Sequence, residues 1–326
     1  ISEDQKEMLF ANLGWFGSFL GSDTTTRNQL IQGAETKVLG AGILFGVVCL
    51  FGFIGCIGLL VSLVLIINGS IRTNLVDFET RHGIYAEVFA IWLVAFVVLT
   101  TVAGITAFIV AEGDLAVTML FTLLAFFLSL VVLVWARLRG ISWDEIYRDI
   151  GWSKGKGVVK ETFAGVYGYA MTLPILTVGI LMTLGLTLLQ TEHLNQHDPF
   201  AGTGGAHPIV ADIANGGLGV RVLLFLLAAV AAPVIEETMF RGVLYRQLRS
   251  STHKLGLWLS MLVSILLTSF LFAAIHPQGW IAIPALMSIA VGMNLMREWR
   301  GTIIPSMVVH GMSNGIVISM MFIFLS

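Results

Sequence analysis

Long apolar stretches alternate with short polar connections along almost the whole chain. At 1.5 Å per residue, helical runs of about 17 to 32 apolar residues are long enough to cross a bilayer core of about 30 Å. Backbone polar groups must be paired within lipid, so the predicted fold class is all-α, a polytopic membrane helix bundle. The pattern predicts about eight transmembrane helices, placed at 38–68, 84–112, 115–137, 158–189, 219–249, 255–276, 280–296 and 302–325.

Composition supports a membrane protein. Hydrophobic residues make up 56% of the chain and charged residues 12%, against about 25% charged residues in soluble domains. The net charge of −2 provides no strongly basic character, so no nucleic-acid partner is expected. Cys49 and Cys56 lie in one apolar run without a neighbouring His or Asp, and we expect both to be packing residues.

Basic residues predict the orientation of the helices. The stretch from Gln190 to Gly219 has no Lys or Arg, so we expect it to be external, and both termini then lie outside as well. We expect a bacterial inner (plasma) membrane. The residues placed on the cytoplasmic side are Arg137, Arg139, Arg148, Lys154, Lys156 and Lys160 after the third helix, then Arg246, Arg249, Lys254, Arg297 and Arg300.

These patterns divide the chain into three regions. Residues 1–37 form an external or interfacial segment, 38–157 hold the first three transmembrane helices and a basic cytoplasmic loop, and 158–326 hold the remaining helices. Within the basic loop, residues 141–151 mix aromatic and aliphatic side chains with charges. Both an interfacial amphipathic helix and an ordinary surface loop fit that segment.

The fifth predicted helix carries two adjacent carboxylates. Glu237 and Arg241 are four residues apart, on one helical face and within reach of an ion pair, whereas Glu236 points about 100° away. Glu237 is therefore expected to serve structure. Glu236 has no partner in its own helix, which makes it the candidate general base. Pro233 cannot donate to the preceding turn, so the helix is expected to kink or restart there.

Two further polar pairs lie in later helices. Phe272 and His276 are four apart at the end of the sixth helix, and His310 and Asn314 are four apart in the eighth. Each pair also has a structural interpretation: His276 as an interfacial residue, His310 and Asn314 as interhelical hydrogen-bonding groups. Together with Glu236 they supply a general base, a water-orienting partner and an oxyanion-stabilising pair.

The three patterns, EExxxR at Glu236, Glu237 and Arg241, FxxxH ending at His276, and HxxxN ending at Asn314, resemble the signature motifs of a protease family. It is the CPBP family, also called the type II CAAX prenyl endopeptidase or Abi family, of intramembrane glutamic endopeptidases. All three motifs occur in order over roughly 223–317. The resemblance implies that 158–326 is a CPBP-like catalytic core.

The resemblance also implies a membrane-embedded, metal-independent glutamic endopeptidase without a cofactor, acting on a membrane-embedded or lipidated peptide, possibly a prenylated CAAX-type substrate. Glu236 would then activate water with help from His276, and His310 with Asn314 would stabilise the oxyanion. Glu237, Arg241 and Phe272 would support the site.

Three other interpretations stay open. The chain could be a non-catalytic subunit that keeps the family fold and binds partners in a membrane complex. It could be a transporter that uses the same residues as a proton relay. Glu236, His276 and His310 could also bind zinc, as two imidazoles and a carboxylate.

The predicted helix ends conflict with a shared site. Measured from the predicted cytoplasmic ends at 1.5 Å per residue, Glu236, His276 and His310 lie about 20, 33 and 15 Å deep. A common site therefore requires tilt, a kink or a different helix end.

Overall fold

The computed structural model describes residues 15–70, 72–75, 83–193 and 217–325, and these residues form helices and connections without a strand. The external segment predicted at 190–219 lies largely outside them, as do the first 14 residues. The N-terminal half contains α2 (Trp15–Gly21), α3 (Thr24–Ile67), α4 (Ile84–Ala111), α5 (Leu115–Ser129), α6 (Leu133–Leu138), α7 (Trp143–Ile150) and α8 (Val158–His193). The C-terminal half contains α10 (Leu218–Leu226), α11 (Ala232–Glu237), α12 (Tyr245–Thr252), α13 (Leu257–Ala274), α14 (Ile283–Arg300) and α15 (Ile304–Leu325).

The all-α polytopic bundle is confirmed. Eight helices of the described part of the chain are long and apolar enough to cross a membrane, and they coincide with the eight predicted segments. Two boundaries differ clearly. The first helix begins at Thr24, before the boundary predicted between residues 37 and 38, and the fifth continues to Leu255. Hydropathy alone misses both extensions because they are polar helical turns.

Side-chain caps explain where several helices begin. Asp23 accepts a hydrogen bond from the Thr26 amide at 2.7 Å, which starts α3 fourteen residues earlier than the apolar run suggests. Ser142 and Glu145 form a reciprocal capping box at the start of α7. The segment 141–151 is therefore helical, and the surface-loop interpretation is wrong.

Helix α7 packs its apolar face into the protein. Ile146 and Ile150 are fully buried, whereas Trp143 and Tyr147 are exposed on the other side. Helix α7 can come this close because residue 242 is a glycine. A Cβ atom on Gly242 would lie 2.9 Å from the Ile150 carbonyl oxygen. The amphipathic pattern thus marks a contact with the C-terminal half of the chain.

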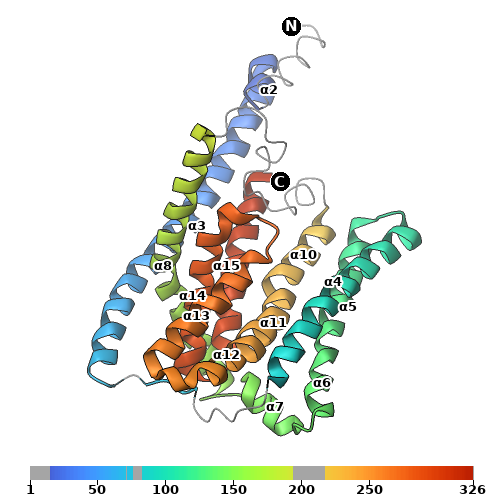
Figure 1. The fold of residues 1–326 in the computed structure, drawn as a ribbon. Coiled ribbons are helices and arrows are strands. Elements are labelled where there is room, and N and C mark those ends of the chain that lie inside the picture. The colour runs from blue at the N-terminus through green and yellow to red at the C-terminus, as the bar shows by residue number, and fades with distance from the viewer. Residues whose placement is uncertain (1–14, 71, 76–82, 194–216, 326) are drawn as a thin grey trace.

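Helix α8 connects the two halves of the bundle. It packs against α14 and α15 on one side and against α3 on the other (Figure 1). The contact with α3 depends on Gly55, where a Cβ atom would meet the Ala170 carbonyl oxygen at 1.8 Å. Helices α4 and α5 pair at the opposite edge of the bundle, and α4 also packs against the helix that carries the two carboxylates.

Helix α3 presents most of its apolar surface outward. Only Ala41, Gly55 and Gly58 are buried along its 44 residues. Cys49 and Cys56 are exposed, so the prediction that they are packing residues is wrong. The two cysteines are exposed because α3 contacts the bundle through one narrow face, and its remaining faces are suited to lipid.

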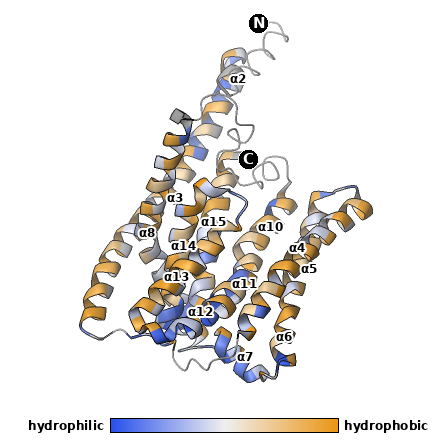
Figure 2. Cartoon of the chain, viewed as in Figure 1, coloured by the Kyte–Doolittle hydropathy of each residue, from blue (hydrophilic) through white to orange (hydrophobic). Residues whose placement is uncertain are grey.

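Polar residues gather at one end of the bundle, around α7 and α12, whereas the helix surfaces between the ends are apolar (Figure 2). Helix α2 and the last turn of α15 both lie at the opposite end (Figure 1). Because eight spans lie between them, an even number, α2 and the last turn of α15 must lie on the same side of the membrane. The chain is an integral membrane protein, and the predicted orientation with both termini outside stays a prediction.

Candidate active site

The helix that carries the two carboxylates is not a regular α-helix. Two π-helical segments, Leu227–Ala231 and Thr238–Leu244, flank the short α11, which contains Pro233 and ends at Glu237. Proline has no N–H, so the backbone cannot keep a continuous hydrogen-bond ladder there. Wide π turns of this kind occur frequently at functional sites. The irregularity expected at Pro233 is therefore present, as a change of helical pitch.

Asn314 occupies the gap that the proline leaves. The Ala232 amide donates to the Leu227 carbonyl, five residues back. The next amide in this register would belong to Pro233, which cannot donate to Ala228. Instead, the Asn314 side-chain nitrogen donates to the Ala228 carbonyl oxygen at 2.8 Å. The hydrogen bond ties α15 to the carboxylate helix, as the interhelical interpretation of this residue expects.

Glu237 and Arg241 form the ion pair that their spacing predicts. The Arg241 Nη1 atom lies 2.9 Å from Glu237 Oε1, and both side chains are fully buried. A second contact was not predicted: His310 Nδ1 lies 2.9 Å from the same Glu237 oxygen. Because a carboxylate only accepts hydrogen bonds, Nδ1 of His310 carries the proton and Nε2 faces away from Glu237. Glu237 therefore fixes the orientation of His310.

Glu236 lies between the two imidazoles. Its Oε2 atom is 3.9 Å from His276 Nε2 and 3.9 Å from His310 Nε2. These separations are too long for direct hydrogen bonds and short enough for one bridging water. Oε2 is itself buried and has no hydrogen-bond partner among the described residues. Buried polar atoms without partners are rare in proteins. Glu237 Oε2 and Arg241 Nε share this state, but Glu236 Oε2 is the one that lies between both histidines.

His276 lies in the turn that follows α13, not in the helix itself. Its Nδ1 atom is 2.5 Å from the Phe272 carbonyl oxygen, one helical turn earlier. A carbonyl only accepts, so Nδ1 is the donor and Nε2 is directed at Glu236. The local hydrogen bond therefore sets the tautomer and brings the imidazole back toward the helix.

Phe272 packs against three of the polar groups. Its ring centroid is 4.4 Å from that of His276 and 5.6 Å from that of His310, and the Arg241 guanidinium lies 4.6 Å above it. The His310 contact is T-shaped, and the Arg241 cation lies over the electron-rich face of the Phe272 ring. Phe272 thus holds both imidazoles at the edge of the buried ion pair.

The helix ends remove the predicted difference in depth between Glu236 and His276. With the fifth span ending at Leu255 and α13 beginning at Leu257, Glu236 and His276 each lie about 28 Å along their helices from the same end. His310 reaches them because the turn before α15 is itself buried. Thr302 and Ile303 lie inside the protein, where the Ile303 amide donates to the Gly151 carbonyl at 3.1 Å.

Sequence reasoning missed a buried network of charges beneath the site. The basic residues Arg246, Arg249 and Arg297 served only to predict the cytoplasmic side, and the structure buries all three in helices, with exposed fractions of 7%, 1% and 0%. Arg246 pairs with Asp149 at 3.2 Å, and Arg249 pairs with Glu298. In the sequence, the only sign of this network was that Asp149 and Glu298 lie in helical segments at the same end of the bundle as the arginines.

Arg297 links this network to the site. Its Nη2 atom donates to the Asp149 carbonyl at 2.7 Å, and Nε donates to the carbonyl of Arg241 at 3.3 Å. Tyr85 and Tyr245 donate to Asp149 and Glu298 at 2.9 and 2.7 Å. The carboxylate helix is therefore anchored at its polar end to α7 and α14.

The site brings together residues from three separate helices and one turn. Six of the seven predicted residues contact one another there, and Asn314 bonds to Ala228 one turn along α15 from His310. The structure does not assign their roles. Among the described residues, no group of three His, Cys, Asp or Glu side chains has the geometry to hold a metal ion. Metal-independent chemistry stays a prediction.

Comparison with known proteins agrees with the motifs. Residues 218–316 match a family described as type II CAAX prenyl endopeptidase Rce1-like. This segment contains all seven predicted site residues, and the resemblance that the motifs indicate is confirmed over it. Neither the curated proteins nor the solved structures contain a match to the chain.

Proposed function

On the premise that residues 218–316 are similar to type II CAAX prenyl endopeptidases, we propose that this protein is an intramembrane endopeptidase in which Glu236 activates the attacking water. The family match supports a CAAX-type membrane protease at the level of the family. The single observation that carries the mechanism is the buried, unpartnered Glu236 Oε2, 3.9 Å from both imidazole Nε2 atoms.

In the first step, Glu236 takes a proton from a water held between its Oε2 atom and His276 Nε2. The water oxygen attacks the carbonyl carbon of the scissile peptide bond, and the carbonyl oxygen becomes an oxyanion. His276 can accept a hydrogen bond from this water, because its Nδ1 proton is directed at Phe272 and its Nε2 lone pair is free.

His310 and Asn314 stabilise the oxyanion. The ion-paired Glu237 accepts from His310 Nδ1 and so fixes the direction of Nε2. In the proposed mechanism, a proton on Nε2 donates a hydrogen bond to the developing negative charge. One N–H of Asn314 donates to Ala228, and the second supplies the other oxyanion donor. Glu237 and Arg241 hold this half of the site in place.

In the second step, protonated Glu236 returns its proton to the leaving nitrogen as the carbon–nitrogen bond breaks. The products are a carboxylic acid, which keeps the second proton of the water, and an amine, which receives the proton that Glu236 took. No step of the proposed mechanism consumes a metal or a redox equivalent.

The proposed substrate is a membrane-embedded or lipidated peptide, with a prenylated CAAX-type sequence as the specific candidate. Its cleavage would take place in the bacterial inner (plasma) membrane, with the polar end of the bundle at the cytoplasmic face. The site is enclosed by transmembrane helices, so a substrate anchored in the bilayer reaches it at higher effective concentration than a soluble peptide.

The test is proteolysis by the purified protein in lipid vesicles. Glu236→Gln keeps the size of the side chain and removes the base, and we expect cleavage to fall by about 10²- to 10⁴-fold. Glu87→Gln is the matched control, because Glu87 lies on α4 and forms an exposed ion pair with Arg139. Its activity should equal that of the unmodified protein.

Cleavage that survives in Glu236→Gln contradicts the proposal. If the variant folds normally and the unmodified protein cleaves no membrane peptide, the alternative is a non-catalytic subunit of a membrane complex. That alternative predicts unchanged assembly with partner proteins when Glu236 is replaced by alanine.

A further inference from the structure

A cavity of about 680 Å³ lies on the side of α14 away from the catalytic residues. Its walls come from α3, α8, α13 and α14, and none of Glu236, His276, His310 or Asn314 lines it. This volume falls within the range of about 300–1,000 Å³ typical of small-molecule sites. The cavity is therefore a second candidate binding site, separate from the proposed peptidase centre.

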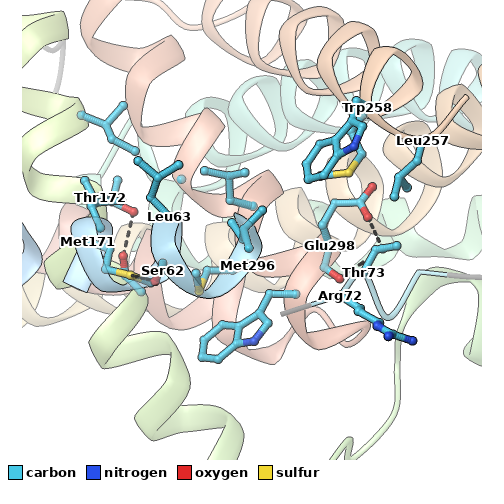
Figure 3. Close-up of a pocket in the computed structure, with 18 of the residues that line it drawn as sticks. Ser62, Leu63, Arg72, Thr73, Met171, Thr172, Leu257, Trp258, Met296 and Glu298 are labelled. Carbon is cyan, nitrogen blue, oxygen red and sulfur yellow. Dashed lines mark hydrogen bonds between the residues drawn. The ribbon is translucent and has the colours of Figure 1, made fainter. Parts of the chain in front are cut away.

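The cavity walls are apolar and open to the surroundings of the bundle. Leu63 on α3 and Trp258 on α13 are 55% and 65% exposed, although both lie within membrane-spanning segments (Figure 3). Met171 and Met296 line the inner wall. Flexible, polarisable methionine side chains adapt readily to an alkyl chain. A hydrocarbon could thus enter from the bilayer without crossing water.

One end of the cavity is polar. Thr73 and Glu298 meet there through a hydrogen bond, and Arg72 lies beside them (Figure 3). Glu298 is neutralised by Arg249 and also accepts from Tyr245 at 2.7 Å. Arg72 is exposed and donates only to the Gly69 carbonyl, at 3.4 Å, with no carboxylate partner among the described residues. The end of the cavity therefore presents one uncompensated positive charge.

We propose that this cavity binds one phospholipid with an anionic headgroup. An acyl chain lies between α3 and α13, and the headgroup phosphate pairs with Arg72 at the polar end of the bundle. Basic residues beside pockets between transmembrane helices recognise anionic headgroups in this way. The combination of an apolar chamber, lateral exposure and a cation at the interface matches the two-part chemistry of a lipid.

The lipid also explains how α3 is held to the bundle. This helix contacts α8 closely at Gly55, but toward Ile66 it lines the cavity. A bound acyl chain would fill the space between α3 and α13 and complete the packing of the helix end. The site is thus a structural lipid site beside the peptidase centre.

The experiment compares lipid retention by four variants. Protein is purified in mild detergent after reconstitution in vesicles of phosphatidylglycerol and phosphatidylcholine, and bound lipid is measured by native mass spectrometry. Arg72→Gln removes the charge, with Arg148→Gln as a control at an exposed arginine on α7. Leu63→Trp fills the cavity, with Leu60→Trp as a control on an exposed face of the same helix.

We expect Arg72→Gln to retain about fivefold less phosphatidylglycerol, the effect of one basic residue at a membrane surface, with phosphatidylcholine unchanged. Leu63→Trp should lose both lipids, and the two control variants should behave like the unmodified protein. Glu236→Gln should retain lipid normally, which separates this site from the proposed catalysis.

Equal retention by all variants would overturn the proposal and show that the lipid is only part of the surrounding bilayer. A second result would also overturn it: a photoreactive lipidated peptide crosslinks to the unmodified protein but not to Leu63→Trp, and added phospholipid does not reduce the crosslinking. The cavity would then hold the lipid of a peptide substrate.

Discussion

Helices α3 and α14 show opposite relations between apolar character and burial. Helix α3 is almost entirely apolar within its membrane-spanning part, yet only three of its residues are buried. Helix α14 carries Asn294, Arg297 and Glu298, and all three are buried within the protein. In a membrane, apolar residues can face lipid, whereas polar side chains need partners that only other helices provide. Polar positions therefore locate the interior of this bundle better than hydrophobic ones do.

The largest expected effect on stability comes from breaking a buried ion pair. Arg241→Met leaves the Glu237 carboxylate buried without its ion-pair partner, and we expect a loss of about 3–5 kcal/mol in unfolding free energy. Arg139→Met breaks only the exposed pair with Glu87 and should cost less than about 1 kcal/mol. Reversible unfolding in detergent measures both. Similar losses in the two variants would show that the buried ion pair matters no more to stability than the exposed one.

An intermediate effect is expected where α3 meets α8. Gly55→Leu places a side chain against the Ala170 backbone and should destabilise the protein by about 1–3 kcal/mol through overpacking. Gly46→Leu, on the same helix, meets nothing within 4 Å and should leave stability unchanged or slightly improved. Thermal unfolding distinguishes them. If both variants are equally stable, α3 does not depend on this contact.

The smallest effect on stability is expected at the π-helical segment. Asn314→Ala removes the hydrogen bond to Ala228, and interhelical hydrogen bonds in membranes contribute about 0.6 kcal/mol on average. Because the same change releases the carboxylate helix and removes the proposed oxyanion donor, we expect proteolysis to fall far more than stability. Ser319→Ala is the control, since Ser319 bonds only within its own helix. Equal activity in the two variants would remove Asn314 from the proposed site.

Much of the site followed from spacing. The i, i+4 separation of Glu237 and Arg241 gives an ion pair in almost any helix, and the structure contains it. The same spacing did not indicate that Glu237 also orients His310, because those residues are 73 positions apart. The burial of the three arginines was missed for a related reason: the distribution of basic residues predicts a membrane side but does not separate solvated residues from buried ones.

The sequence by itself determined the eight spans, the all-α class and the three motifs, since these depend on local apolar runs and on residues within one or two helical turns. Only the tertiary structure decided that Glu236, His276 and His310 meet. Their common position depends on a fifth span longer than its apolar run, on π turns around Pro233, and on a buried turn before α15. Pro233 by itself predicts an irregular helix, but these three features form a common site only through packing between helices, which no local pattern encodes.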